Sequence, residues 1–255
     1  MAAELSESRY AHVFEQIYSI DLIFRPNCWT LCSDAHCCHF SRYKTPGDPA
    51  FHEIPLLPGE WDFLNRTGHI RQYADYRRLE LEVKLTTGVL AYESLRIPAA
   101  QCPCTHDIRP TICRLYPLLP VYSATAGLVG VDTRVTLFDV IEEVLDLPRA
   151  CRIGEIPLGE LQKFMELTRV LGSEPVLVFH LMAYKLVKDV LRKYLLKTVA
   201  TSGRPTGSRE AIADRITALQ RDLVVKGVDW GAVHAALNDL GNQFRSIYGL
   251  SFRLS

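Results

Sequence analysis

The sequence predicts a mainly α protein with minor β structure, in which a loop-rich, cysteine-bearing portion packs on a helical C-terminal portion. Three observations predict this class. Apolar residues at helical spacing dominate the last hundred residues, prolines and glycines crowd residues 41–59, and cysteines gather in two short stretches. We therefore divide the chain into a cysteine-cluster domain over residues 1–155 and a helical region over residues 156–255.

The N-terminal portion predicts short elements between loops. Residues 4–20 have helical periodicity, and residues 41–59 are typical of a loop. A second helix is expected from Glu60, residues 73–83 fit no single pattern, and residues 85–91 and 129–138 indicate strands. Pro103, Pro110 and Pro117 argue against a regular helix within or beside the second cysteine cluster.

The C-terminal portion predicts several helices. One covers residues 158–171, and a longer one covers 174–199 with Ser173 as its N-cap. Residues 201–208 indicate a break, and residues 212–223 a further helix. Asp229 is expected to cap a last helix whose buried stripe includes Val233, Leu237, Leu240 and Phe244. In the long helix, the lysines of 185–197 favour a solvated face, and His180 a satisfied core residue.

Composition favours a folded protein of the cytosol. The 255 residues are 48% hydrophobic and carry a formal net charge of zero, so nothing favours nucleic acid or an anionic membrane as a partner. The first residues lack the basic and apolar regions of a secretory signal, and charges interrupt the most apolar stretch, 176–199. We expect a cytoplasmic protein.

Eight cysteines in a reducing compartment predict metal binding, because disulfides are rare there. Crowded thiolates repel one another unless a cation neutralises them, and they select zinc or iron–sulfur clusters over hard ions. An iron–sulfur cluster, with 4Fe-4S as the expected type, is the first interpretation, and zinc is the alternative. The candidate metal ligands are Cys28, Cys32, Cys37, Cys38, Cys102, Cys104, Cys113 and Cys151.

Several polar residues are candidates for supporting roles. Arg109 and Arg114 adjoin the second cluster, and Arg152 adjoins Cys151. These arginines are expected to donate hydrogen bonds to the sulfur atoms of the metal ligands. His36 and His39 are expected near the site or at the surface, with metal ligation through a neutral ring nitrogen as the alternative. The weaker catalytic candidates, each with a structural alternative such as a turn, a packed ring or a helix terminus, are His106, Asp107, Tyr116 and Glu60.

These motifs resemble one known group. The double cysteine at 37–38, the Pro-Gly-Glu60-Trp61 segment and the run Arg109-Pro-Thr-Ile-Cys-Arg-Leu-Tyr-Pro117 resemble the YkgJ-like CxxCxxxCC family of zinc- or iron-chelating proteins. The resemblance covers roughly residues 25–155, although the spacings within both cysteine clusters differ from the family's pattern. It implies metal binding, and relatives that resemble flagellin lysine N-methylases add a protein lysine N-methylase-like enzyme as an alternative.

Two classes of function stay open. The chain is expected to be an iron–sulfur-dependent oxidoreductase or transferase acting on a small molecule or a protein. The alternative is a structural zinc protein that serves as an interaction module, in which each zinc ion has four protein ligands. The sequence names no substrate.

Overall fold

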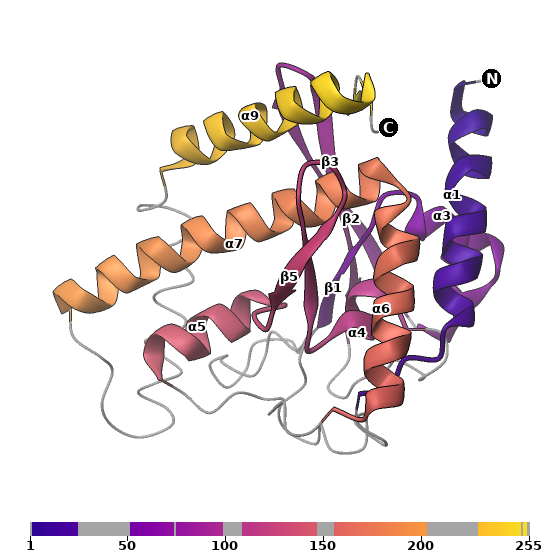
Figure 1. Cartoon of the computed structure of the whole chain (residues 1–255), viewed down its shortest axis with the longest axis horizontal. Coiled ribbons are helices and arrows are strands. Elements are labelled where there is room, and N and C mark those ends of the chain that lie inside the picture. The colour runs from indigo at the N-terminus through magenta and orange to yellow at the C-terminus, as the bar shows by residue number, and fades with distance from the viewer. Residues whose placement is uncertain are drawn as a thin grey trace.

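The structure is a computed structural model that describes residues 2–24, 52–73, 75–98, 109–146, 156–202, 229–250 and 252–253. The described part confirms the mainly α class with minor β structure (Figure 1). The expected helix over 212–223 and most of the expected break over 201–208 lie outside these residues, although Thr201 and Ser202 belong to the long helix α7.

The larger sheet has the order β1-β3-β2 and consists of β1 (His52–Leu56), β2 (Arg77–Leu85) and β3 (Gly88–Ile97). Both β1 and β2 run antiparallel to β3, and β6 (Phe252–Arg253) pairs in parallel with the start of β3. The prediction of a loop through residue 59 was wrong for β1. Pro55 is tolerated in that strand because β1 lies at an edge of the β1-β3-β2 path, where a missing N–H donor does little harm.

The β2–β3 hairpin also corrects the expected strand over 85–91. Leu85 pairs with Gly88, so the chain turns at Thr86 and Thr87, in the middle of the predicted strand. Because threonines are common in strands, the sequence pattern did not indicate a turn at these positions. A second sheet joins β4 (Leu119–Tyr122) to β5 (Leu128–Asp132), and β5 ends well before residue 138 because Thr136 caps the next helix.

The long helices agree with the apolar periodicity. They are α1 (Ala2–Ser19), α6 (Leu158–Gly172), α7 (Pro175–Ser202) and α9 (Trp230–Tyr248). The side chain of Asp229 caps α9 as predicted, accepting a hydrogen bond from the Ala232 N–H at 2.9 Å. The assignment of Ser173 was wrong. It ends α6 by donating to the Val170 carbonyl at 2.6 Å, while the Glu174 carbonyl accepts the first bond of α7.

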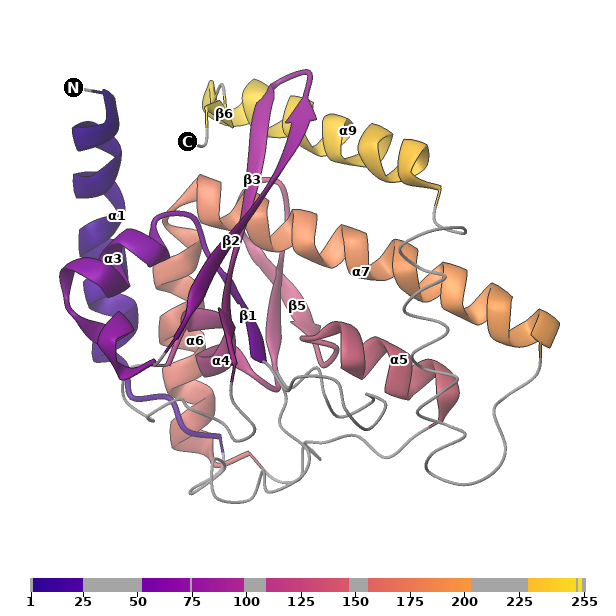
Figure 2. The same ribbon diagram turned by 180° about the vertical axis from the view of Figure 1, so that it is seen from behind.

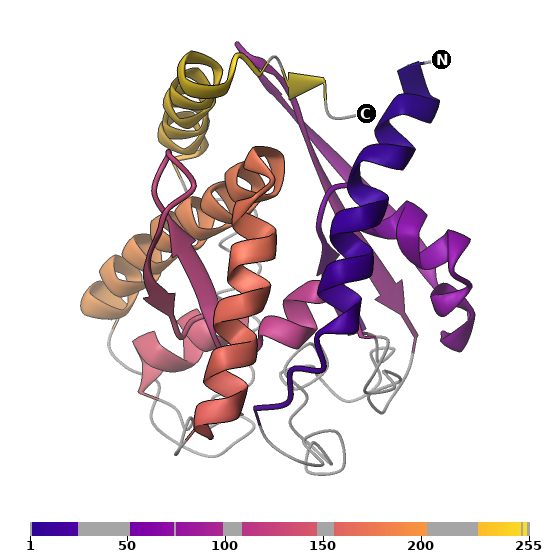
Figure 3. The ribbon, with the colours of Figure 1, turned by 45° about the vertical axis from the view of Figure 1, so that its right-hand side comes forward.

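Shorter helices join these parts: α3 (Glu60–Arg66), the 3-10 helix η2 (His69–Gln72), α4 (Thr111–Leu115) and α5 (Leu137–Leu145). Figures 1 and 2 show α7 and α9 side by side with the β2–β3 hairpin crossing them, and Figure 3 shows α1 beside α6. One hydrophobic core includes residues from both sides of residue 155, among them Phe14, Leu115, Phe164, Phe179 and Phe244. The two predicted regions therefore share a core, and the boundary between them stays a prediction.

Within the described residues, no single helix has the length and apolar character needed to cross a membrane. Taken together, α6 and the first part of α7 (Pro175–Ala200) meet that criterion, but they are bent by 109° relative to each other.

Candidate metal centre and adjoining cavity

Cys113 is the candidate ligand that the structure places. It lies half-buried, as a free thiol, on the single helical turn α4. The prolines did not prevent this turn, because Pro110 occupies its N-cap, where the missing N–H is not needed. The following candidates lie outside the described residues: Cys28, Cys32, Cys37, Cys38, Cys102, Cys104, Cys151, His36, His39, His106, Asp107 and Arg152.

A buried carboxylate fixes the start of α4. Glu60 has no exposed surface, and its side chain accepts hydrogen bonds from the Thr111 N–H and hydroxyl, both at 2.6 Å. It also accepts bonds from the Leu57 N–H and the Tyr18 hydroxyl, each at 2.9 Å. Burial raises the pKa of this carboxyl, and the hydrogen bonds from Leu57 and Thr111 oppose the shift. Glu60 therefore connects α1, α3 and α4, and its contact with α4 is at Thr111, two residues before Cys113.

Two arginines also hold this turn in place. Arg114 is 2% exposed and donates to the carbonyls of Arg109 and Ile20 at 2.9 and 3.1 Å. Its guanidinium carbon lies 4.4 Å from the centroid of the Tyr18 ring. Arg109 donates to the Leu22 carbonyl at 2.6 Å. These contacts fix α4 against the segment that follows α1, and the expected donation by both arginines to sulfur stays a prediction.

Residues that flank the cysteine-bearing segments are hydrogen-bonded to one another. Arg109, which follows residues 99–108, binds Leu22 close to the start of residues 25–51. The N–H of Ile23 donates at 2.6 Å to Glu160, in the first turn of α6 after residues 147–155. At the opposite ends of two of these segments, His52, which follows residues 25–51, pairs in the sheet with Ile97, which lies just before residues 99–108. Figure 3 shows the end of α1, the turn α4 and the start of α6 together at one end of the molecule.

A cavity of about 500 Å³ adjoins Cys113. Its walls come from the sheet, α4, α7 and α9, and most of the side chains in them are apolar. Ile112, Cys113 and Tyr116 line the end at α4. Tyr116 thus lies close to the candidate ligand, and its hydroxyl donates to Asp139 at 3.0 Å.

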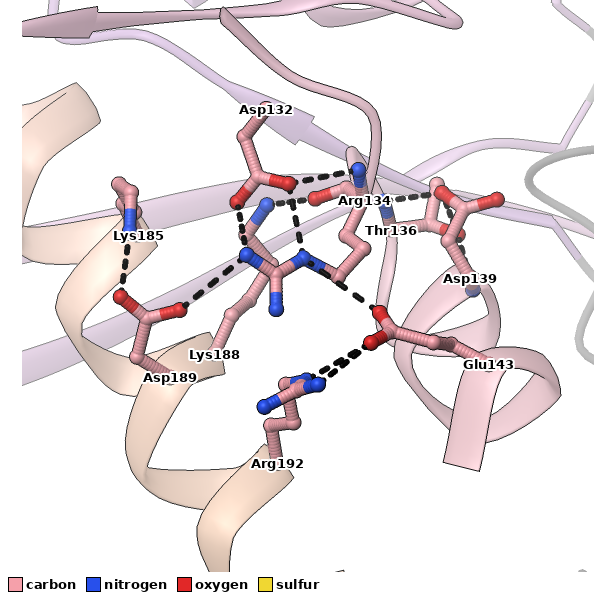
Figure 4. Close-up of polar contacts among 9 residues, drawn as sticks. All are labelled: Asp132, Arg134, Thr136, Asp139, Glu143, Lys185, Lys188, Asp189 and Arg192. Carbon is pink, nitrogen blue, oxygen red and sulfur yellow. Dashed lines mark hydrogen bonds and ion pairs between the residues drawn. The ribbon is translucent and has the colours of Figure 1, made fainter. Parts of the chain in front are cut away.

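A network of charged groups supports the cavity wall formed by α7 (Figure 4). Arg134 pairs with Asp132 at 2.8 Å, and Arg192 pairs with Glu143 at 2.6 Å. Lys188 donates to the Arg134 carbonyl. The prediction of a solvated lysine face was wrong for Lys188, which is 3% exposed because the network and the cavity wall cover it, and burial lowers its pKa to about 8.

Among the residues that the structure describes, no group of three or more His, Cys, Asp or Glu side chains is arranged to hold a metal ion. No protein-family model, curated protein or solved structure matches the chain. The resemblance to the YkgJ-like family therefore stays a prediction.

Proposed function

We propose that this protein binds a metal centre through its cysteines, with Cys113 as one ligand. An iron–sulfur cluster is the proposed group and zinc the alternative. The donor chemistry supports this proposal, because Cys113 is a free thiol on a turn that Glu60 and Arg114 hold in place. A preorganised soft ligand of this kind suits zinc or an iron–sulfur cluster.

The hydrogen bonds between the flanking residues carry the proposal. Two of these bonds, from Arg109 to Leu22 and from Ile23 to Glu160, connect the ends of three segments that contain the other seven cysteines. A chain spans at most about 3.6 Å per residue, so Cys28 and Cys104, which are five residues from Ile23 and Arg109 respectively, are tethered to the same end of the molecule. This arrangement favours one shared centre, or neighbouring centres, over isolated core cysteines.

The cavity favours an enzyme over a closed structural zinc site. Cys113 lines a cavity large enough for a small molecule, so a centre held by Cys113 would adjoin a bound substrate. When bound, an iron–sulfur cluster supplies electron transfer or an accessible iron. The protein's own residues shape the substrate space and hold the Tyr116 hydroxyl on Asp139 at its edge. We propose an oxidoreductase or transferase that works in the cytosol, where thiols stay reduced.

The test is metal and sulfide analysis of the full chain purified without oxygen. Iron with acid-labile sulfide is expected, and Cys113→Ser should lower both. Ile112→Val is the matched control, since it changes the neighbouring wall residue and should keep the wild-type metal content. A colourless protein with stoichiometric zinc would refute the iron–sulfur proposal and favour the structural zinc alternative. A protein free of both metals would refute metal binding.

A further inference from the structure

We propose that the cavity is a binding site for a neutral, mainly apolar small molecule with one hydrogen-bond-accepting oxygen, such as a ketone, and that His180 recognises this oxygen. Ligand binding itself does not depend on a metal. That the ligand is also the substrate of the centre rests on the proposed function above.

The mainly apolar side chains in the cavity walls indicate a mainly apolar ligand. About 500 Å³ lies within the usual size range of small-molecule sites. Leu81 and Trp230 line the cavity and are 61% and 51% exposed, so its entrance is accessible from solvent. The hairpin, α7 and α9 contribute the apolar wall residues Leu90, Val187, Leu191 and Val233.

His180 supplies the polar group. It lines the cavity, is only 5% exposed, and its ring lies parallel to that of Tyr92, at 5° with the centroids 6.2 Å apart. Its Nδ1 has no hydrogen-bond partner among the described residues, so the sequence-based view of a satisfied core histidine was wrong in that respect. Burial lowers the pKa of His180 to about 4, which leaves the ring neutral at pH 7.

The environment of Nδ1 sets the type of ligand group. A neutral imidazole has one donor and one acceptor nitrogen. With no acceptor beside Nδ1, the favoured tautomer carries its proton on Nε2, and the ring can then offer an N–H donor to the cavity. The matching ligand group is an oxygen acceptor.

Charged ligands fit the cavity poorly, because three wall residues that could pair with a charge, Glu53, Lys188 and His234, already have protein partners. Glu53 pairs with Arg96 at 2.8 Å, and His234 bonds the Lys84 carbonyl at 2.6 Å. Lys188 is held by the Arg134 carbonyl. A charge brought into these apolar walls would lose its hydration without gaining a counter-ion.

The probe for this site is 6-propionyl-2-dimethylaminonaphthalene, a neutral aromatic ketone whose fluorescence reports polarity and hydrogen bonding. The full chain should bind it saturably at one site per chain, and should bind the anionic 8-anilinonaphthalene-1-sulfonate more weakly. Ala183→Phe adds a ring to the α7 wall and should weaken binding more than tenfold. Ala235→Phe, on the exposed side of α9, is the matched control and should leave binding unchanged.

His180→Phe keeps a ring against Tyr92 and removes the proposed donor. It should weaken ketone binding about two- to tenfold, the usual range for one lost hydrogen bond. It should also shift the emission of the bound probe to the blue, while binding of 2-ethylnaphthalene, which has no acceptor, stays the same. Equal loss for both ligands would overturn the role of His180, and absence of saturable binding by the wild-type chain would overturn the site. Metal analysis of the same samples separates these failures from failure of the proposed function.

Discussion

Substitution of Glu60 tests how the helical turn α4, which contains Cys113, is stabilised. The buried carboxylate of Glu60 accepts hydrogen bonds from four donors in three parts of the chain. Oε1 accepts the bonds from Tyr18 and from both donors of Thr111, while Oε2 accepts the bond from the Leu57 N–H. Glu60→Ala removes all four acceptor interactions. Glu60→Gln keeps the shape of the side chain and, with its oxygen in the place of Oε1, loses the bond to Leu57 alone.

The geometry sets the size of each effect. The hydroxyls of Tyr18 and Thr111 can rotate to other partners, but the main-chain N–H groups of Leu57 and Thr111 cannot. A buried donor left without a partner costs about 1–3 kcal/mol. We therefore expect Glu60→Gln to lower the free energy of unfolding by about 1–3 kcal/mol, and Glu60→Ala by about 2–6 kcal/mol. Domains commonly have only about 5–15 kcal/mol in total.

Urea unfolding followed by far-UV circular dichroism measures these changes, read as a shift of the midpoint at constant slope. Asp62→Asn is the matched control. It lies exposed in the same first turn of α3, and its loss should cost no more than about 1 kcal/mol through the helix dipole. A Glu60→Gln protein within about 0.5 kcal/mol of wild type would refute the role assigned to Glu60.

Three further outcomes follow from other buried contacts. Between pH 6.5 and 4 the unfolded chain protonates His180 and the folded chain does not, so wild type should lose about 3 kcal/mol of stability as the pH falls through this window. His180→Phe should lack this part of the loss in urea unfolding at each pH, and parallel pH curves would contradict the assignment. Lys188, whose pKa is lowered from 10.5 to about 8, should make wild type more stable as the pH rises from 8 to 10.5, and Lys188→Met should remove that rise. A methyl group at Gly241 would overlap the Thr87 hydroxyl, so Gly241→Ala should cost about 1–3 kcal/mol in thermal unfolding, and adding Thr87→Ala should recover most of it.

Local signals explain which elements were predictable. Asp229 and the apolar stripe of α9 lie within one segment, so the sequence predicts both the start of the helix and its buried face. The turn at Thr86 and Thr87 carries no such signal, because threonine also suits strands. For α4, prolines indicated a loop, while the hydrogen bonds from Thr111 to Glu60, 51 residues earlier in the chain, fix a helical turn.

The sequence predicts a candidate ligand at Cys113, but it does not predict the cavity beside that residue. Cysteine crowding identifies Cys113 as a candidate ligand, but the cavity beside it is assembled from the hairpin, α7 and α9, which lie far apart in the sequence. For the same reason the burial of Lys188 was missed. Its local sequence is lysine-rich, and only the packing of the Arg134 region against α7 encloses it.

X-ray absorption at the iron and zinc edges, on the chain purified without oxygen, measures directly whether its cysteines hold an iron–sulfur cluster. We expect bound iron with sulfur as its main neighbours, and a loss of sulfur neighbours or of iron in Cys113→Ser. Zinc in a shell of four protein ligands at the usual distances, about 2.3 Å for sulfur, would favour the structural alternative. The absence of both metals, or a metal with only oxygen and nitrogen neighbours, would refute metal binding through the cysteines.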